Sequence, residues 1–275
     1  RLSGTPFNLL AISRRMRYIL GDYVMEQRAK ASWDELHFWR PESIRILPTM
    51  NIYTYDLGRL LNEFVDEDVA FNFREFFRVN DNGTFVHDKD VSAFLNLITK
   101  EDRESCYPFA NEEYRNIFRH TLWMLPGVKE ARAMSAMLQT HSVFQHFKVV
   151  NVAGNGDEDE ESKDALVAVE EAIGKDPDAT RTITLSCGRL TTGVSVKAWT
   201  AVFMLSGSYN TAASSYMQTI FRVQTPAAIN GKVKEQCYVF DFAPDRTLKV
   251  IAETAKISSK TGKTSGNDRK IMGES

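Results

Sequence analysis

From residue 121 onward, short apolar segments alternate with amphipathic segments, and this alternation limits the fold more than any other feature of the chain. Apolar segments typical of strands occupy residues 121–125, 148–152, 182–187, 199–205 and 236–242. Segments with apolar residues at helical spacing lie between them, at 128–138, 162–173 and 212–222. Such alternation is typical of right-handed βαβ units, so the sequence predicts an α/β fold in three layers with a mainly parallel sheet.

The segment 57–120 has a different character and predicts a helical insertion with its own aromatic core. Four phenylalanines crowd residues 71–77, and residues 91–98 have the apolar spacing of an amphipathic helix. Asn80 to Gly83 predicts a turn. These residues resemble a calcium-binding loop, but Arg78 stands where the first carboxylate is required, five residues before Gly83, so no calcium site is predicted.

The remaining segments complete a predicted division of the chain into four parts. Residues 44–57 alternate and are rich in Ile, Tyr and Thr, which predicts a strand, and Pro48 favours an edge position or a break. The polar residues 157–161 predict a solvated acidic loop before the helix at 162–173, and their charges are also acceptable at the start of that helix. Beyond 255 the composition becomes polar and predicts a flexible tail. The predicted parts are 1–56, the insertion at 57–120, the main lobe at 121–255 and the tail at 256–275.

Composition narrows the class of protein. The net charge of −2 gives no overall basic field, so any binding of nucleic acid must be local. The three cysteines are far apart and lack metal-ligand spacing, which suits a reducing cytosol and predicts neither a metal site nor a disulfide framework. We expect a cytoplasmic protein, since no signal peptide and no apolar run of membrane-spanning length is recognised. The chain begins RLSGTPF without an initiating Met, which predicts a fragment of a longer protein.

The candidate site lies within residues 182–226. A hydroxyl-rich loop, Thr191-Thr192-Gly193, separates two predicted strands and offers hydroxyls and backbone amides to a phosphate. Gln218 and Arg222 are four apart on the predicted helix, so they are expected to project together. The plainer alternatives are a strand-to-loop cap for the loop residues and a salt bridge on a helix face for Arg222.

A second candidate segment follows the first regular strand. Gly127 and Lys129 come after residues 121–125, at the carboxyl edge of the predicted sheet. Open α/β sheets bind ligands at that edge. Lys129 is therefore a further candidate for contact with nucleic acid.

These segments, in this order, resemble the second RecA-like lobe of a superfamily-two helicase or translocase. The sequence from LTTGVSV through YMQTIFRVQTP to DFAPDR is similar to that of restriction-system helicase subunits, particularly the type III restriction-enzyme res-subunit class. TTGVSV, at 191–196, resembles the fifth helicase motif, a Gly-centred loop that touches the nucleic-acid backbone and the nucleotide site. The resemblance implies nucleic-acid contacts for Thr191 and Thr192, and nucleotide coupling for Gly193 and Ser195. Ser195 stands where many relatives have Asp.

Residues 218–225 resemble the sixth motif, usually Q-x-x-G-R-x-x-R, whose arginines face the γ-phosphate held by the other lobe. The resemblance therefore implies catalytic roles for Arg222 as an arginine finger and for Gln218 as the residue that orients water or nucleotide. Phe221 replaces the usual glycine and Thr225 the usual second arginine. Only Arg222 is left to act as the finger.

Two further segments match motifs of the same family. Ser3-Gly4-Thr5 resembles the third motif, which couples the two lobes, so Ser3 and Thr5 are implied coupling residues and 1–56 would be the end of a first-lobe motif plus a linker. Residues 121–127 stand where the fourth motif's strand and turn belong, and Gly127, like Lys129 just beyond it, is a candidate for contact with nucleic acid. No phosphate loop or acidic box occurs in the sequence. By the resemblance they belong to the first lobe, which would hold ATP and Mg²⁺, so the fragment alone is expected to be inactive.

The resemblance implies the C-terminal motor lobe of an ATP-dependent DNA helicase or translocase from a restriction system. The implied partners are DNA, the first RecA-like lobe, and methylase or nuclease modules, with no membrane. The alternative is a non-catalytic RecA-like lobe that serves as a nucleic-acid or protein interaction module, which the degenerate sixth motif favours. A small-molecule α/β enzyme would need a carboxylate or nucleophile constellation, and none stands out in the sequence.

Overall fold

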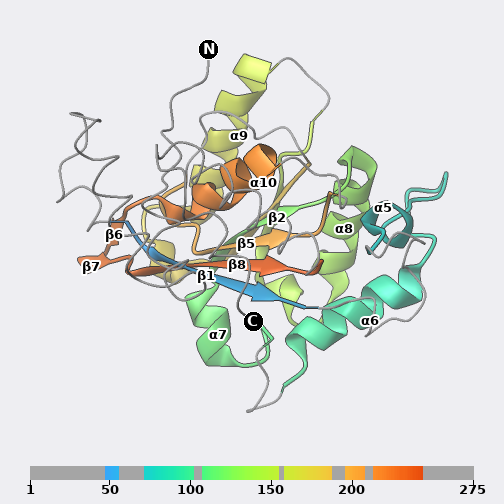
Figure 1. Cartoon of the computed structure of the whole chain (residues 1–275), viewed down its shortest axis with the longest axis horizontal. Coiled ribbons are helices and arrows are strands. Elements are labelled where there is room, and N and C mark those ends of the chain that lie inside the picture. The colour runs from blue at the N-terminus through green and yellow to red at the C-terminus, as the bar shows by residue number, and fades with distance from the viewer. Residues whose placement is uncertain are drawn as a thin grey trace, which may run out of the picture.

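The centre of the molecule is a six-stranded sheet in which every neighbouring pair of strands is parallel (Figure 1). The computed structural model describes residues 47–55, 71–101, 107–154, 158–187, 196–207 and 213–243. The strands of this sheet are β1 (Thr49–Thr54), β2 (His120–Met124), β3 (Lys148–Asn151), β4 (Thr182–Ser186), β5 (Ala201–Met204) and β8 (Gln236–Asp241), in the order β1-β8-β5-β2-β4-β3. The predicted α/β class and parallel sheet are confirmed.

The burial of each strand follows its position in the sheet. Every residue of β2, β4 and β5 is buried, as expected for strands with near-continuous apolar sequence and a neighbour on each side. β1 and β3 lie at the two ends of the described sheet and are only partly buried. Pro48 directly precedes β1. The edge position predicted for this strand is confirmed.

Helices cover both faces of the sheet, so the predicted three-layer arrangement is confirmed. α8 (Val128–Thr140) packs through Ala131, Met134 and Leu138 into one core, which also contains Trp123. α9 (Glu158–Ile173) and α10 (Ala213–Ile220) pack into a second core on the other face, and Figure 1 shows these two helices on the same side of the sheet.

The start of α9 differs from the sequence-based prediction. The helix begins at Glu158, so residues 158–161 lie in its first turns, and the predicted acidic loop is wrong for them. Acidic residues are favourable at a helix N-terminus because the helix dipole places partial positive charge there. The predicted end is confirmed: Gly174 has φ +76° and its N–H donates to the Glu170 carbonyl at 2.9 Å.

Within the described residues, the helices before β2 are α5 (Phe73–Phe76), α6 (Asp88–Thr99) and α7 (Glu112–Ile117). The predicted turn is present, with the Gly83 N–H donating to the Asn80 carbonyl at 3.0 Å. The predicted separate aromatic core is not found among the described residues. The phenylalanines of this region belong to the same core as the sheet, with ring centroids of Phe94 and Phe242 5.2 Å apart and those of Phe109 and Phe203 5.5 Å apart. The sheet presents large rings on this face, and the helices bury them.

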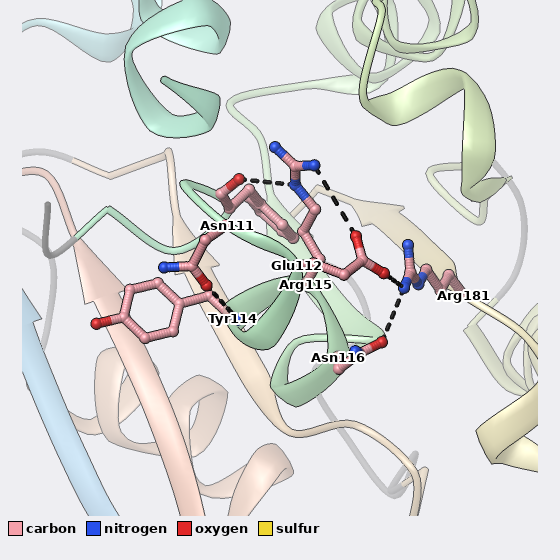
Figure 2. Close-up of polar contacts among 7 residues, drawn as sticks. Asn111, Glu112, Tyr114, Arg115, Asn116 and Arg181 are labelled. Atoms are coloured by element: carbon pink, nitrogen blue, oxygen red, sulfur yellow. Dashed lines mark hydrogen bonds and ion pairs between the residues drawn. The ribbon is translucent and has the colours of Figure 1, made fainter. Parts of the chain in front are cut away.

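A polar network attaches α7 to the amino end of β4 (Figure 2). Arg181, directly before β4, donates to the carboxylate of Glu112 and, at 2.8 Å, to Oδ1 of Asn116. Its guanidinium also lies 5.8 Å from the ring centroid of Phe147. Arg115 of α7 donates to the Phe109 carbonyl at 2.9 Å. Together these contacts fix the short helix against the main sheet.

Replacing Arg181 with methionine is expected to destabilise the chain by about 1–2 kcal/mol, because the variant loses two hydrogen bonds and the contact with Phe147. The expected loss stays small because Glu112 is well exposed to solvent. Denaturant unfolding at neutral pH measures the effect. The control is Arg78→Met, which removes an exposed ion pair with Glu75 and should change the unfolding free energy by less than about 0.5 kcal/mol. Equal effects of the two variants would contradict a special role for Arg181.

His120 is a buried histidine at the start of β2. Its Nε2 lies 2.8 Å from the Pro177 carbonyl, which can only accept, so Nε2 carries the proton and Nδ1 accepts from the Thr182 hydroxyl at 2.9 Å. Burial lowers the pKa of His120 below its usual value of 6.5, although the hydrogen bond to Pro177 opposes the change. The neutral ring is therefore part of the folded structure.

Stability is expected to fall as the pH falls below about 6.5, because the unfolded chain takes up a proton at His120 that the folded chain excludes. The contribution of this residue is complete above the unfolded pKa, and its slope below that pH is at most about 1.4 kcal/mol per pH unit. Unfolding curves between pH 5.5 and pH 7.5 (about two pH units) measure it. His120→Gln should flatten the curve, whereas His146→Gln, at an exposed position, should not. The same slope in His120→Gln and the parent chain would refute the assignment.

Candidate nucleotide and nucleic-acid site

The sheet has a topological switch point between β2 and β5. The chain leaves β2 through α8 towards β3, and leaves β5 through α10 towards β8, which lies in the opposite direction. The two helices lie on opposite faces, as right-handed crossovers in opposite directions require. Ligands of open α/β sheets bind outside the carboxyl ends of the strands at such a point. The carboxyl ends of β2 and β5 are therefore the geometric candidate for a site.

Gly127 and Lys129 lie at this switch point, as predicted for the carboxyl edge. Gly127 is the residue before α8, and Lys129, in the first turn, is exposed. The carboxylate of Glu130 is folded back against Gly127, so closely that a Cβ at Gly127 would clash with Oε2 of Glu130. A phosphate that approached the first amides of α8 would meet this carboxylate and would have to displace it.

Gln218 and Arg222 occupy different environments. α10 ends at Ile220, and the chain continues as a 3-10 turn, η3 (Phe221–Gln224). Gln218 is exposed, whereas only 7% of Arg222 is exposed. The prediction of one helix through residue 222 with both side chains on one face is wrong. The tighter turn accompanies the burial of Val223 and a hydrogen bond from the Thr225 hydroxyl to the Arg222 carbonyl at 3.0 Å.

The guanidinium of Arg222 remains positively charged despite its burial. Burial lowers its pKa from the usual arginine value to about 10, which is still well above neutral pH. A cation with little hydration loses less solvation when it binds an anion, and its forked donors fit phosphate oxygens. Arg222 therefore has the electrostatic character that an anion-binding residue needs.

Two polar residues that bear on this region were not singled out from the sequence. Tyr216, on α10, donates its hydroxyl to Oδ2 of Asp241 at 2.8 Å, and both side chains are buried. Asp241 ends β8, the strand predicted at 236–242. The sequence signal that could have indicated this pair was an aspartate at the end of a largely apolar strand, because a buried carboxyl needs hydrogen-bond donors.

Lys234 is a third buried polar residue, and its contacts are structural. Its Nζ donates to the carbonyls of Lys197 and Trp199 at 3.0 and 3.1 Å. Burial lowers its pKa to about 8. These bonds attach the hairpin of β6 (Ala228–Ile229) and β7 (Lys232–Val233) to the segment that enters β5.

The other predicted site residues lie outside the described residues. They are Ser3, Thr5, Thr191, Thr192, Gly193 and Ser195. Their nucleotide and nucleic-acid roles stay predictions. Within the described parts of the chain, no cluster of three or more His, Cys, Asp or Glu side chains is suited to a metal ion. No helix in those parts combines the length and apolar character needed to cross a membrane.

Comparison with known proteins gives one clear relative. A Mycoplasma pneumoniae protein, described as the C-terminus of a type II restriction enzyme and methyltransferase, is 31% identical over 286 residues. The match covers 93% of this chain and 38% of the relative, so the chain spans well under half of that protein's length. No protein-family model matches the chain.

Three solved structures are similar at low sequence identity. The ATP-dependent type ISP restriction-modification enzyme LlaBIII bound to DNA is 14% identical with a TM-score of 0.46, covering 78% of this chain and 14% of the other. The Sulfolobus solfataricus SWI2/SNF2 ATPase core domain is 12% identical with a TM-score of 0.39, covering 93% and 56%. The C-terminal part of the Fun30 ATPase domain is 11% identical with a TM-score of 0.34, covering 93% and 75%. These scores, all below 0.5, describe only partial superposition.

The match to the Mycoplasma pneumoniae relative extends over nearly the whole chain. The parallel sheet between two helical layers has the architecture that the motifs implied. The described α/β architecture agrees with the RecA-like fold that the motifs implied, and the chain is similar to a protein described as a restriction enzyme and methyltransferase.

Proposed function

We propose that the chain is the C-terminal motor lobe of an ATP-dependent DNA helicase or translocase of a restriction system. The complete protein would bind ATP and Mg²⁺ mainly through a first RecA-like lobe, and this lobe would supply Arg222 to the γ-phosphate. The chain alone would not hydrolyse ATP, because its sequence contains no phosphate loop and no acidic box. DNA, the first lobe, and methylase or nuclease modules are the proposed partners.

The observation that carries the proposal is the state of Arg222, a buried but charged guanidinium on the turn that continues α10. Phosphoryl transfer depends on positioning and on stabilising charge that develops on the phosphate oxygens. An arginine finger supplies both effects from a second lobe, and Gln218, exposed on α10 just before that turn, would orient water or nucleotide. Because Arg222 is only 7% exposed, closure of the first lobe must bring the nucleotide against its guanidinium or turn that group outward.

The DNA contacts are proposed at the carboxyl edge of the sheet. Lys129 is exposed in the first turn of α8, and Thr191 and Thr192 follow β4 in the sequence, which ends at the same edge. Such groups contact phosphates without reading bases, which suits a motor that moves along any sequence. Glu130 would weaken binding at Gly127 unless its carboxylate moves away from the helix start.

The alternative is a lobe kept for interaction rather than catalysis. The degenerate sixth motif, which keeps a single arginine, favours this alternative, and so does the carboxylate against Gly127, which keeps an anion from the first amides of α8 in the free lobe. A complete protein without ATP hydrolysis would support it.

ATP hydrolysis by the complete protein, with and without duplex DNA, tests the proposal. We expect hydrolysis that DNA stimulates, and DNA affinity that falls steeply with salt, because neutralising backbone phosphates releases counterions. A folded complete protein that hydrolyses no ATP at any DNA concentration would refute the motor function. DNA binding that is insensitive to salt would refute the proposed backbone contacts.

A further inference from the structure

A buried carboxyl group lies at the carboxyl end of β8, on the face covered by α10. Along this strand, Cys237 and Val239 belong to the core that contains α10, whereas Phe240 belongs to the opposite core. Side chains alternate along a strand, so Asp241 lies on the α10 face, where an apolar residue would be the ordinary choice. Asp241 is fully buried, with 0% exposure.

Both carboxyl oxygens of Asp241 accept hydrogen bonds. The Tyr216 hydroxyl donates to Oδ2 at 2.8 Å, and the Ala243 N–H donates to Oδ1 at 2.9 Å. Tyr216 is 1% exposed. A buried carboxyl is costly unless it is hydrogen-bonded, so this bond is a specific link between α10 and β8.

The link restricts how α10 can move. Met217 and Ile220 also pack into the core between this helix and the sheet. Apolar contacts, however, tolerate sliding and rotation of the helix better than a hydrogen bond of fixed length and direction. The bond from Tyr216 to Asp241 defines the rotation of the helix and its height above the sheet. Gln218 lies on the same helix and Arg222 on the turn that follows it, so this bond also determines where these two residues lie.

A second hydrogen bond fixes the other end of this segment. Gln224 is 5% exposed, and its Nε2 donates to the Pro48 carbonyl at 3.0 Å. Pro48 precedes the amino end of β1, and β1 pairs in parallel with β8. The two bonds therefore fix the segment at opposite ends of adjacent strands, and Arg222 lies between them.

We infer that Tyr216, Asp241 and Gln224 are positioning residues for Arg222, which hold the α10–η3 segment in the geometry that phosphoryl transfer requires. This inference rests on the proposed function, because it needs Arg222 to act on a nucleotide. Displacement of a catalytic group by about 1 Å can lower a rate on the order of a hundred-fold, so loss of either anchor should be visible in kcat.

The test is Tyr216→Phe in the complete protein, which removes one hydroxyl and leaves the ring in place. We expect kcat for DNA-stimulated ATP hydrolysis to fall on the order of ten-fold, with KM for ATP within about two-fold of the parent value. Gln224→Met, which removes the donor to Pro48, should give the same pattern. The matched control is Tyr238→Phe, since Tyr238 lies on the opposite face of the same strand and its hydroxyl donates to Gln236 there, and its kcat should not change.

A double-mutant cycle separates positioning from a structural role. In an Arg222→Ala background, Tyr216→Phe should lower kcat by less than about two-fold, because a residue that acts through Arg222 has nothing left to position. Equal ten-fold losses with and without Arg222 would overturn the inference. So would an unchanged kcat in Tyr216→Phe while Arg222→Ala is impaired, and that result would leave the proposed function intact. Hydrolysis that is unaffected by Arg222→Ala would instead refute the arginine finger itself.

Discussion

Arg222→Ala in the complete protein is expected to lower kcat for DNA-stimulated ATP hydrolysis on the order of a thousand-fold, the usual contribution of an arginine finger. The guanidinium stabilises charge that appears on the phosphate in the transition state, so kcat should fall much more than affinity for ATP. The effect should persist over the pH range in which the protein is folded, because the pKa of Arg222, lowered by burial to about 10, keeps it charged. Single-turnover hydrolysis of bound ATP measures the loss.

The burial of Arg222 calls for two accompanying variants. Arg222→Met keeps most of the side-chain length and should be as inactive as Arg222→Ala, while filling more of the buried space. Arg132→Ala removes an exposed arginine from α8 and should retain parent activity. If Arg222→Met hydrolyses ATP at the parent rate with DNA present, Arg222 is a structural residue and the interaction-module alternative gains support.

Local sequence patterns predicted most of the lobe. Apolar runs located the strands that are buried on both faces, because such strands need nearly continuous apolar sequence. Gly174 located the end of α9, because a left-handed residue at this position is easiest for glycine. These features depend on a few neighbouring residues. Sequence patterns can therefore identify them.

Apart from the start of α9, the errors concern contacts between residues far apart in the chain. α10 stops at Ile220 although the helical pattern continues, and the following turn is held by Gln224, whose partner Pro48 is 176 positions away. The link between Tyr216 and Asp241 is likewise invisible to a local pattern. The aromatic residues of 71–120 were expected to pack with one another, and only the sheet topology shows which phenylalanines of β5 and β8 they cover.

The sequence predicted where Gly127 and Lys129 of the candidate site lie, but it did not predict the geometry around the candidate residues. Strand–helix alternation placed Gly127 and Lys129 at the carboxyl edge, and the structure puts them at a switch point. The carboxylate of Glu130 against Gly127 depends on the rotamer of one side chain, which the sequence does not specify. The burial of Arg222 depends on the packing of η3 against the sheet.

Phe203→Ala is expected to lower the free energy of unfolding by about 3–5 kcal/mol, a large part of the 5–15 kcal/mol typical of a domain. Phe203 lies in the middle of the sheet with no exposure, and its ring is 4.9 Å from that of Trp123 and 4.8 Å from that of Phe240. Its ring also stacks on Phe109, from the helical region before β2, so the variant opens a cavity shared by the sheet and the helices.

The same variant tests whether the helices of 71–118 share one core with the sheet. In a shared core, Phe203→Ala in β5 and Phe94→Ala in α6 should each shift a single unfolding transition, and tryptophan fluorescence and circular dichroism should report the same midpoint. Tyr53→Ala is the control, because this ring is 42% exposed at the end of the described sheet and should cost about 1 kcal/mol. Two separate transitions, with Phe94→Ala moving only one of them, would show that the helices form an independent unit. A single shifted transition would show that the helices and the sheet unfold as one cooperative unit, as their shared core predicts.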